Sequence, residues 1–191
     1  MPSIVSTQQL RSVLGVSVSL YPDSYLDEII NTAEAVILPM LVANTSAINA
    51  YKLESNVATY YTQRAHHFVA GQSVVVAGLP APFSATVTVV DVKEFHFTAA
   101  ITSANVTLRD IIPTGTATLS GYSAAEIYAN SAPIESAVLA VSVEVFQSRV
   151  AAGGQIEGVD FQSTPYRMGR SLTNRVSTLL MPFLDVETVV Q

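Results

Sequence analysis

The 191-residue chain contains no cysteine, and this absence excludes several kinds of site at once. It can form no disulfide bond, thiolate metal site or cysteine nucleophile. A chain without cysteine also fits a cytoplasmic product.

Charge is scarce as well. Charged residues make up 13% of the chain, about half the usual share, whereas hydrophobic residues make up 49%. So few charges leave two ways to cover the surface. Either serine, threonine and amide side chains supply it, or part of it is buried against other subunits.

The few charges are mostly negative, with nine Lys/Arg against 15 Asp/Glu and a net charge of −6. Residues 1–55 carry two basic and five acidic residues, 56–122 carry three of each, and 123–191 carry four and seven. Proteins that bind nucleic acid tightly concentrate positive charge in a patch or stripe. The composition therefore argues against tight binding of nucleic acid.

No membrane span or export signal is expected. The richest apolar run, residues 134–150, is interrupted by Glu135 and Glu144, and a span needs about 20 mainly apolar residues. The N-terminal residues lack a basic stretch followed by an apolar one.

No catalytic or metal site is predicted either. The three histidines, His66, His67 and His96, do not have the spacing of helical metal ligands. The chain also lacks a nucleophile elbow and a Walker loop. We therefore expect neither enzymatic activity nor a cofactor, and interpret the histidines as polar residues on or near strands.

Residues 1–55 predict two helices. A capping box at Ser6 and Gln9 predicts a short helix that ends at Gly15. After Asp23 or Ser24, apolar residues recur every three or four positions, as in an amphipathic helix. The apolar stripe comprises Leu26, Ile29, Ile30, Ala33, Ile37, Met40 and Leu41. The opposite face carries Asp27, Asn31 and Glu34.

The pattern changes to strands over residues 56–122. Runs of β-branched and aromatic residues at 74–76, 86–92, 95–98 and 117–119 are separated by glycine- and proline-containing turns. Short strands at this spacing predict a small antiparallel sandwich or barrel. The chain is thus expected to be α+β, with a β module inserted into a core of about four helices.

Residues 123–191 return to helical patterns. A nearly all-apolar helix is predicted over 133–151, followed by an extended, glycine-containing arm at 153–169 and a last helix from near Ser171. Because the chain has few charges, we expect subunits to associate through the 133–151 helix and the face of the second helix. The predicted interface residues are Ile29, Ile30, Ile37, Val141 and Val145.

Three arginines, Arg167, Arg170 and Arg175, lie between residues 161 and 184, and this stretch contains no acidic residue. Arginine is favoured at protein interfaces because its planar guanidinium pairs with carboxylates through two hydrogen bonds. The stretch, including Tyr166, is therefore interpreted as a docking segment. The alternative is a helix with a solvated basic face.

Four segments, 10–16, 25–35, 133–149 and 165–182, resemble in their order the head-to-tail adaptor (connector) proteins of long-tailed bacteriophages. Residues 66–97 resemble a small β module found in many phage virion proteins, which simple adaptors lack.

The resemblance implies a structural virion protein at the head–tail interface, which is present in the host cytoplasm during assembly. Copies would form a ring, usually dodecameric, between the portal protein and the stopper or tail components. The arginine-rich segment would dock on the portal, and the acidic ring would let DNA slide through its channel without specific binding. The ring contacts would be heterologous, so that rotation closes them.

A second interpretation comes from another functional class. In this alternative, the chain is an oligomeric binding module whose β insert recognises a carbohydrate or a capsid surface. Capture by purified portal, rather than by a glycan, would distinguish the two.

Overall fold

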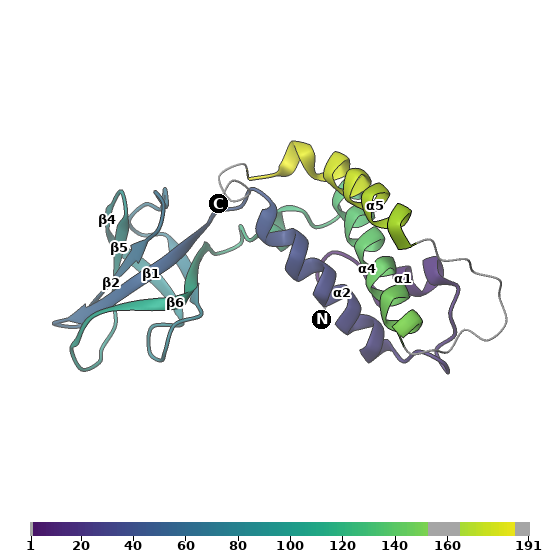
Figure 1. The fold of residues 1–191 in the computed structure, drawn as a ribbon. Coiled ribbons are helices and arrows are strands. Elements are labelled where there is room, and N and C mark those ends of the chain that lie inside the picture. The colour runs from purple at the N-terminus through teal and green to yellow at the C-terminus, as the bar shows by residue number, and fades with distance from the viewer. Residues whose placement is uncertain (1, 153–164, 186–191) are drawn as a thin grey trace. The chain divides into compact units, whose positions relative to one another are not determined.

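The computed structural model describes residues 2–152 and 165–185 (Figure 1). The chain forms two compact units: Met1–Val42 with Ala124–Gln191, and Ala43–Ser123. The first unit is helical and the second is a β-barrel, so the predicted α+β class is confirmed. The predicted module boundary at residues 55 and 56 is wrong, because a strand already begins at Thr45.

The helical unit consists of helices from both ends of the chain. Its elements are α1 (Thr7–Leu14), α2 (Asp23–Ile37), the 3₁₀-helix η1 (Leu38–Met40), α3 (Ala124–Ile127), α4 (Ala132–Ala152), α5 (Pro165–Leu180) and the 3₁₀-helix η2 (Met181–Phe183).

Local signals determine α1 as predicted. The Ser6 side chain accepts a hydrogen bond from the Gln9 backbone N–H, and the Gln9 side chain accepts one from the Ser6 N–H, which completes the capping box. Gly15 ends the helix in the left-handed conformation, with φ of 67°. By contrast, Pro22 occupies the N-cap of α2 without a side-chain cap, in place of the predicted Asp23 or Ser24.

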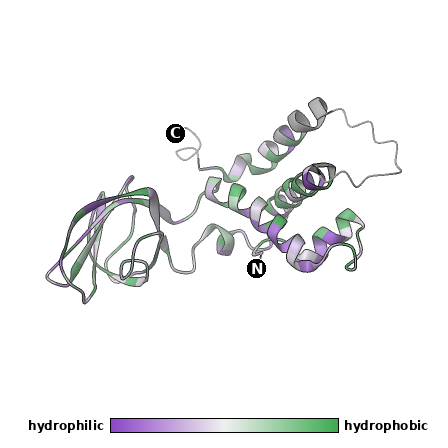
Figure 2. Ribbon diagram, turned by 60° about the horizontal axis from the view of Figure 1, so that its bottom comes forward, coloured by the Kyte–Doolittle hydropathy of each residue, from purple (hydrophilic) through white to green (hydrophobic). Residues whose placement is uncertain are grey.

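Helix α4 packs against both α2 and α5, and α1 packs against α2. Figure 2 shows hydrophobic residues distributed along α4, as expected from a sequence that is apolar nearly all round. The buried core of this unit comprises Ile4, Val5, Leu10, Leu26, Ile29, Ile30, Ala33, Ile37, Leu41, Ile134, Ala137, Val138, Phe146 and Leu180.

Glu34 belongs to this core, contrary to its predicted place on the opposite face of α2. Its side chain is buried and accepts hydrogen bonds from the backbone N–H groups of Ser3 (2.9 Å), Ile4 (2.7 Å) and Val5 (3.4 Å). The Ser3 hydroxyl donates a further bond, at 2.8 Å. Because a buried carboxylate must be paired, these donors stabilise it, and Glu34 in turn holds the N-terminal segment against α2.

The second unit is a closed antiparallel barrel of six strands in the order β1-β2-β5-β4-β3-β6. The strands are β1 (Thr45–Glu54), β2 (Val57–Thr62), β3 (Ser73–Ala77), β4 (Thr86–Lys93), β5 (His96–Ala100) and β6 (Val106–Leu119). Of the two predicted architectures, sandwich and barrel, the barrel is present. Strand β1 was not predicted because it contains Ala, Asn, Lys and Glu, which are depleted in strands.

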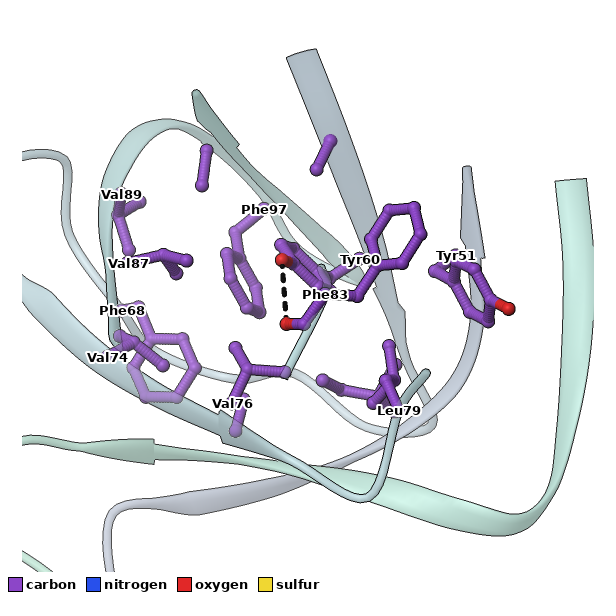
Figure 3. Close-up of a cluster of buried hydrophobic side chains, with 14 of the residues drawn as sticks. Tyr51, Tyr60, Phe68, Val74, Val76, Leu79, Phe83, Val87, Val89 and Phe97 are labelled. Atoms are coloured by element: carbon purple, nitrogen blue, oxygen red, sulfur yellow. Dashed lines mark hydrogen bonds between the residues drawn. The ribbon is translucent and has the colours of Figure 1, made fainter. Parts of the chain in front are cut away.

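Aromatic rings fill the barrel (Figure 3). Phe97 and Tyr60 are fully buried and stack with ring centroids 4.9 Å apart, and Phe68 meets Phe97 edge-on. The Tyr60 hydroxyl donates to the backbone oxygen of Phe83 at 3.2 Å.

Burial raises the pKa of the Tyr60 hydroxyl above its ordinary value of 10.0. Because the folded pKa exceeds the unfolded one, the resulting stabilisation is complete below about pH 10 and is lost as the pH rises through the folded pKa.

The ends of the barrel segment are hydrogen-bonded neighbours. Thr45 of β1 pairs with Thr118 of β6, and the Leu119 N–H donates to the Asn44 oxygen at 2.9 Å. The barrel and the helical unit also have separate hydrophobic cores. The barrel is therefore an insertion, and the two chain segments that connect it to the helical unit start side by side.

We expect the helical unit to fold without the barrel. Replacing residues 43–123 with a short Gly/Ser linker should preserve the helical circular dichroism, because no core residue of the helical unit is removed. A matched deletion of residues 57–121 should behave worse, because it leaves β1 without its partners β2 and β6. Loss of helical signal or aggregation of the 43–123 replacement would show that the two units depend on each other.

Candidate interaction surfaces

The described part of the arginine-rich segment begins with a helix. Helix α5 begins at Pro165, a residue favoured in the first turn, so Tyr166, Arg167 and Arg170 lie within the helix. The predicted extended arm before Ser171 is therefore wrong for residues 165–170, and its remainder, 153–164, lies outside the described residues. The predicted arm ended at Gly169, and α5 nevertheless continues through this residue. A glycine inside a helix costs about 1 kcal/mol relative to alanine, which is too little to end α5 here.

Arg175 is exposed on α5 and makes no ion pair with the part of the chain that the structure describes. An α-helix turns about 100° per residue, so the positions of Arg170 and Arg175 differ by about 140° around its axis. These two predicted docking residues therefore do not share one face. The side chains of Tyr166, Arg167 and Arg170 lie outside the described part.

The inner side of α5 is fixed to the helical core. Leu180 is buried, and Val176, Leu179 and Phe183 pack against the same cluster. Beyond the helix, Leu184 forms an antiparallel bridge with Leu41.

Two backbone hydrogen bonds strengthen this attachment at the end of α2. They run from the Val42 N–H to the Phe183 oxygen (2.9 Å) and from the Asp185 N–H to the Met40 oxygen (2.8 Å). Helix α5 is thus anchored at its C-terminal end.

A cleft of about 220 Å³ lies between α2, η1, α4 and α5. Its lining is almost entirely apolar and comprises Val36, Ile37, Met40, Val141, Leu172, Val176, Ser177, Leu180 and Leu184. The described lining residues include no titratable group, so this part of the cleft can accept an apolar side chain.

The predicted subunit interface is mostly internal. Ile29 and Ile30 are 0% exposed and Ile37 is 1% exposed, so these three side chains form the core of a single copy. The amphipathic stripe was correct, but it packs on the chain's own helices. Val141 and Val145 are half-buried against the same cluster, and Val141 also reaches the cleft.

The outer side of α2 is acidic at its beginning and apolar at its end. Residues Ser24, Asp27, Glu28, Asn31, Thr32, Ala35 and Val36 line one shallow depression along it. Glu28 accepts a hydrogen bond from Arg149 at 2.9 Å, and the Arg149 guanidinium lies 6.0 Å from the Tyr25 ring centre. Within the described residues, Asp27 makes no ion pair.

The histidines do not converge on a site. The His66 ring, in the connection between β2 and β3, is buried, and its Nδ1 accepts from the Phe68 N–H at 3.0 Å. Nε2 therefore carries the proton and donates to the His96 backbone oxygen at 3.1 Å. His67 is exposed, and the His96 ring lies beside the Tyr61 ring in a tilted arrangement, with centroids 5.4 Å apart. Residues 2–152 and 165–185 include no group of three His, Cys, Asp or Glu side chains placed to hold a metal.

Among the described helices, none is long and apolar enough to cross a membrane. Comparison with models of known protein families gives no match, and comparison with curated proteins gives none either.

Proposed function

We propose that the protein is a structural virion component, a head-to-tail adaptor that forms a ring between the portal and the stopper or tail. One observation carries this proposal. The segments that resemble the adaptor family form α1, α2, α4 and α5, which share one core. The segment without a counterpart in simple adaptors forms a barrel outside that core.

The helical unit presents faces for contact, and the described lining of its cleft is almost entirely apolar. The net charge of −6 gives a channel wall that repels the DNA backbone, so DNA passes without specific binding.

The first turns of α5 are the proposed portal contact, through Tyr166, Arg167 and Arg170. Two basic residues on one helix, with no acidic residue between positions 161 and 184, suit a carboxylate-bearing partner. Each charge-assisted hydrogen bond contributes about 1.5–3 kcal/mol. Repetition around a ring raises the overall affinity through avidity.

We expect the variant Arg167→Glu/Arg170→Glu to fold but to lose capture by purified portal, and to yield filled heads without tails. Folding should persist because Leu180, the buried residue in the part of α5 whose side chains are described, lies well beyond both substitutions. The control Lys93→Glu/Arg109→Glu changes net charge equally at two exposed barrel positions and should bind portal normally. Normal portal capture by the α5 variant would contradict the docking role.

A specific feature of the barrel favours the alternative, an oligomeric module that binds a capsid surface or carbohydrate. Ile112 is 94% exposed, and Leu108 on the same strand is also exposed. These side chains offer an apolar contact that the barrel core does not need. Capture of the protein by capsid or glycan, but not by portal, would favour this second function.

A further inference from the structure

The connection between α1 and α2 contains a turn that holds two large apolar side chains in solvent. Residues 17–21, here the apolar turn, are closed by a hydrogen bond from the Tyr21 N–H to the Ser17 oxygen at 3.1 Å. Between these two residues, Val18 is 62% exposed and Leu20 is 67% exposed. Neither side chain belongs to the hydrophobic core of the helical unit. The apolar turn thus offers apolar surface that the fold of one copy does not use.

The base of the apolar turn is fixed on the helical unit. The Arg11 side chain donates to the Tyr21 oxygen at 2.9 Å. The Tyr21 ring stacks on the Tyr25 ring, with centroids 5.7 Å apart, and meets the Phe146 ring edge-on at 4.9 Å. A surface that is already ordered loses less conformational entropy when it binds. The apolar turn is therefore a preformed projection.

The apolar turn is also uncharged. Residues 12–22 include no Asp, Glu, Lys or Arg. The charges on either side of this stretch, Arg11 and Asp23, pair with each other at 2.6 Å. A partner surface for the turn would therefore be apolar and without charge.

The cleft between α2, η1, α4 and α5 has this chemistry. Its described lining residues are almost all apolar and include no titratable group. Its volume is about 220 Å³, and an apolar cavity of about 150 Å³ already holds a molecule of the size of benzene. The cleft therefore has room for a leucine side chain. At its edge, Val36 is 57% exposed, so the apolar surface continues outside the cleft.

The turn and the cleft lie at opposite ends of α2. The apolar turn directly precedes α2, whereas Val36, Ile37 and Met40 of the cleft lie at the end of α2 and in η1. Figure 1 shows the chain entering α2 from α1 at one end and leaving it toward β1 at the other. At a rise of 1.5 Å per residue, Asp23 and Val36 are about 20 Å apart along the helix. The two surfaces therefore cannot meet within one copy, but they can meet between copies arranged head to tail.

We propose that the apolar turn of one copy inserts Leu20 into the cleft of a second copy. Because two different surfaces meet, the contact is heterologous, and repetition with rotation closes a ring. This inference rests on the proposed ring function and names its subunit contact. The portal contact stays at the first turns of α5.

Engineered cysteines test the contact directly, because the chain has none of its own. A Leu20→Cys copy mixed with a Val36→Cys copy should be joined by a short bis-maleimide crosslinker, under the conditions where the native chain assembles, with portal if portal is needed. Each variant alone should give no crosslink, since equivalent residues do not meet in a heterologous contact. Ser148→Cys, exposed on α4 and outside the described cleft lining, is the mismatched partner for Leu20→Cys.

A charge placed on the turn tests its apolar role. Leu20→Asp should fold, because the residue is mostly exposed. It should weaken self-association at least about tenfold, because a carboxylate would have to enter an apolar cleft. Gln8→Asp adds the same charge at an exposed position of α1 and should assemble normally. Sedimentation analysis measures both.

Mixing two defective variants tests the head-to-tail arrangement. Leu20→Asp keeps an intact cleft, and Val36→Asp keeps an intact apolar turn. Each alone should stay monomeric, whereas a mixture should form one-to-one complexes that grow no further. A general loss of folding could not produce this complementation.

The outcomes separate this contact from the ring itself. If the chain assembles without the mixed crosslink, and Leu20→Asp assembles as well as the native chain, the ring has a different interface. A crosslink within Leu20→Cys alone would indicate a two-fold contact between turns and overturn the proposal. Weaker portal capture by Val36→Asp than by Leu20→Asp would place the portal, instead of a second copy, in the cleft. A chain that stays monomeric even with portal present overturns both the contact and the proposed ring.

Discussion

Glu34→Ala is expected to lower the free energy of unfolding of the helical unit by about 3 kcal/mol. The substitution leaves the N–H groups of Ser3 and Ile4 without their acceptor, and hydrogen bonds to a charged group are worth about 1.5–3 kcal/mol each. The side chains of Ile4 and Val5, both buried, would also pack less firmly in the core. Denaturant unfolding followed by circular dichroism measures the effect.

Hydrogen exchange should show the same change locally, with faster exchange at Ser3, Ile4 and Val5. Asn31→Ala is the matched control, because Asn31 is exposed on the same helix and should change stability by less than about 0.5 kcal/mol. Glu34→Gln should be intermediate, since an amide keeps one acceptor oxygen. Unchanged stability of Glu34→Ala would mean that the N-terminal segment is held by its apolar contacts alone.

Phe97→Ala is expected to destabilise the barrel by about 3–5 kcal/mol, the usual cost of deleting a buried aromatic ring. Phe97 is 0% exposed and contacts the rings of Tyr60, Phe68 and His66. Because the two units have separate cores, only the barrel transition should shift in calorimetry.

Phe95→Ala provides the control, since this neighbouring ring is 51% exposed and its loss should change stability little. Equal shifts of both unfolding transitions in Phe97→Ala would show instead that the units unfold as one cooperative body.

Sequence patterns succeeded where the signal was local. The Ser6 capping box, the stripe containing Ile29 and Ile30, and the apolar run of α4 each depend on residues within a few turns of one another. They failed where the partner was distant. Glu34 was placed on the opposite face because its acceptor role depends on Ser3, 31 residues away.

The same reason explains the missed strand and the misassigned interface. The residues of β1 have low strand preference, and pairing with β6 more than fifty residues later decides their conformation. A hydrophobic stripe also does not reveal what covers it. Ile37 packs on the chain's own helices, and nothing in its spacing distinguishes that packing from contact with another subunit. The docking residues Arg167 and Arg170 were identified only as a charge pattern.

The adjacent ends of the barrel also have an evolutionary consequence. Asn44 and Leu119 are joined by a backbone hydrogen bond, so the two ends of the barrel segment are adjacent. Gaining or losing the whole barrel therefore interrupts the backbone of the helical unit at one position only. A recombination event at that point could exchange the barrel for any domain with neighbouring termini. Selection can therefore act on the barrel surface independently of the helices, and related chains should differ there first.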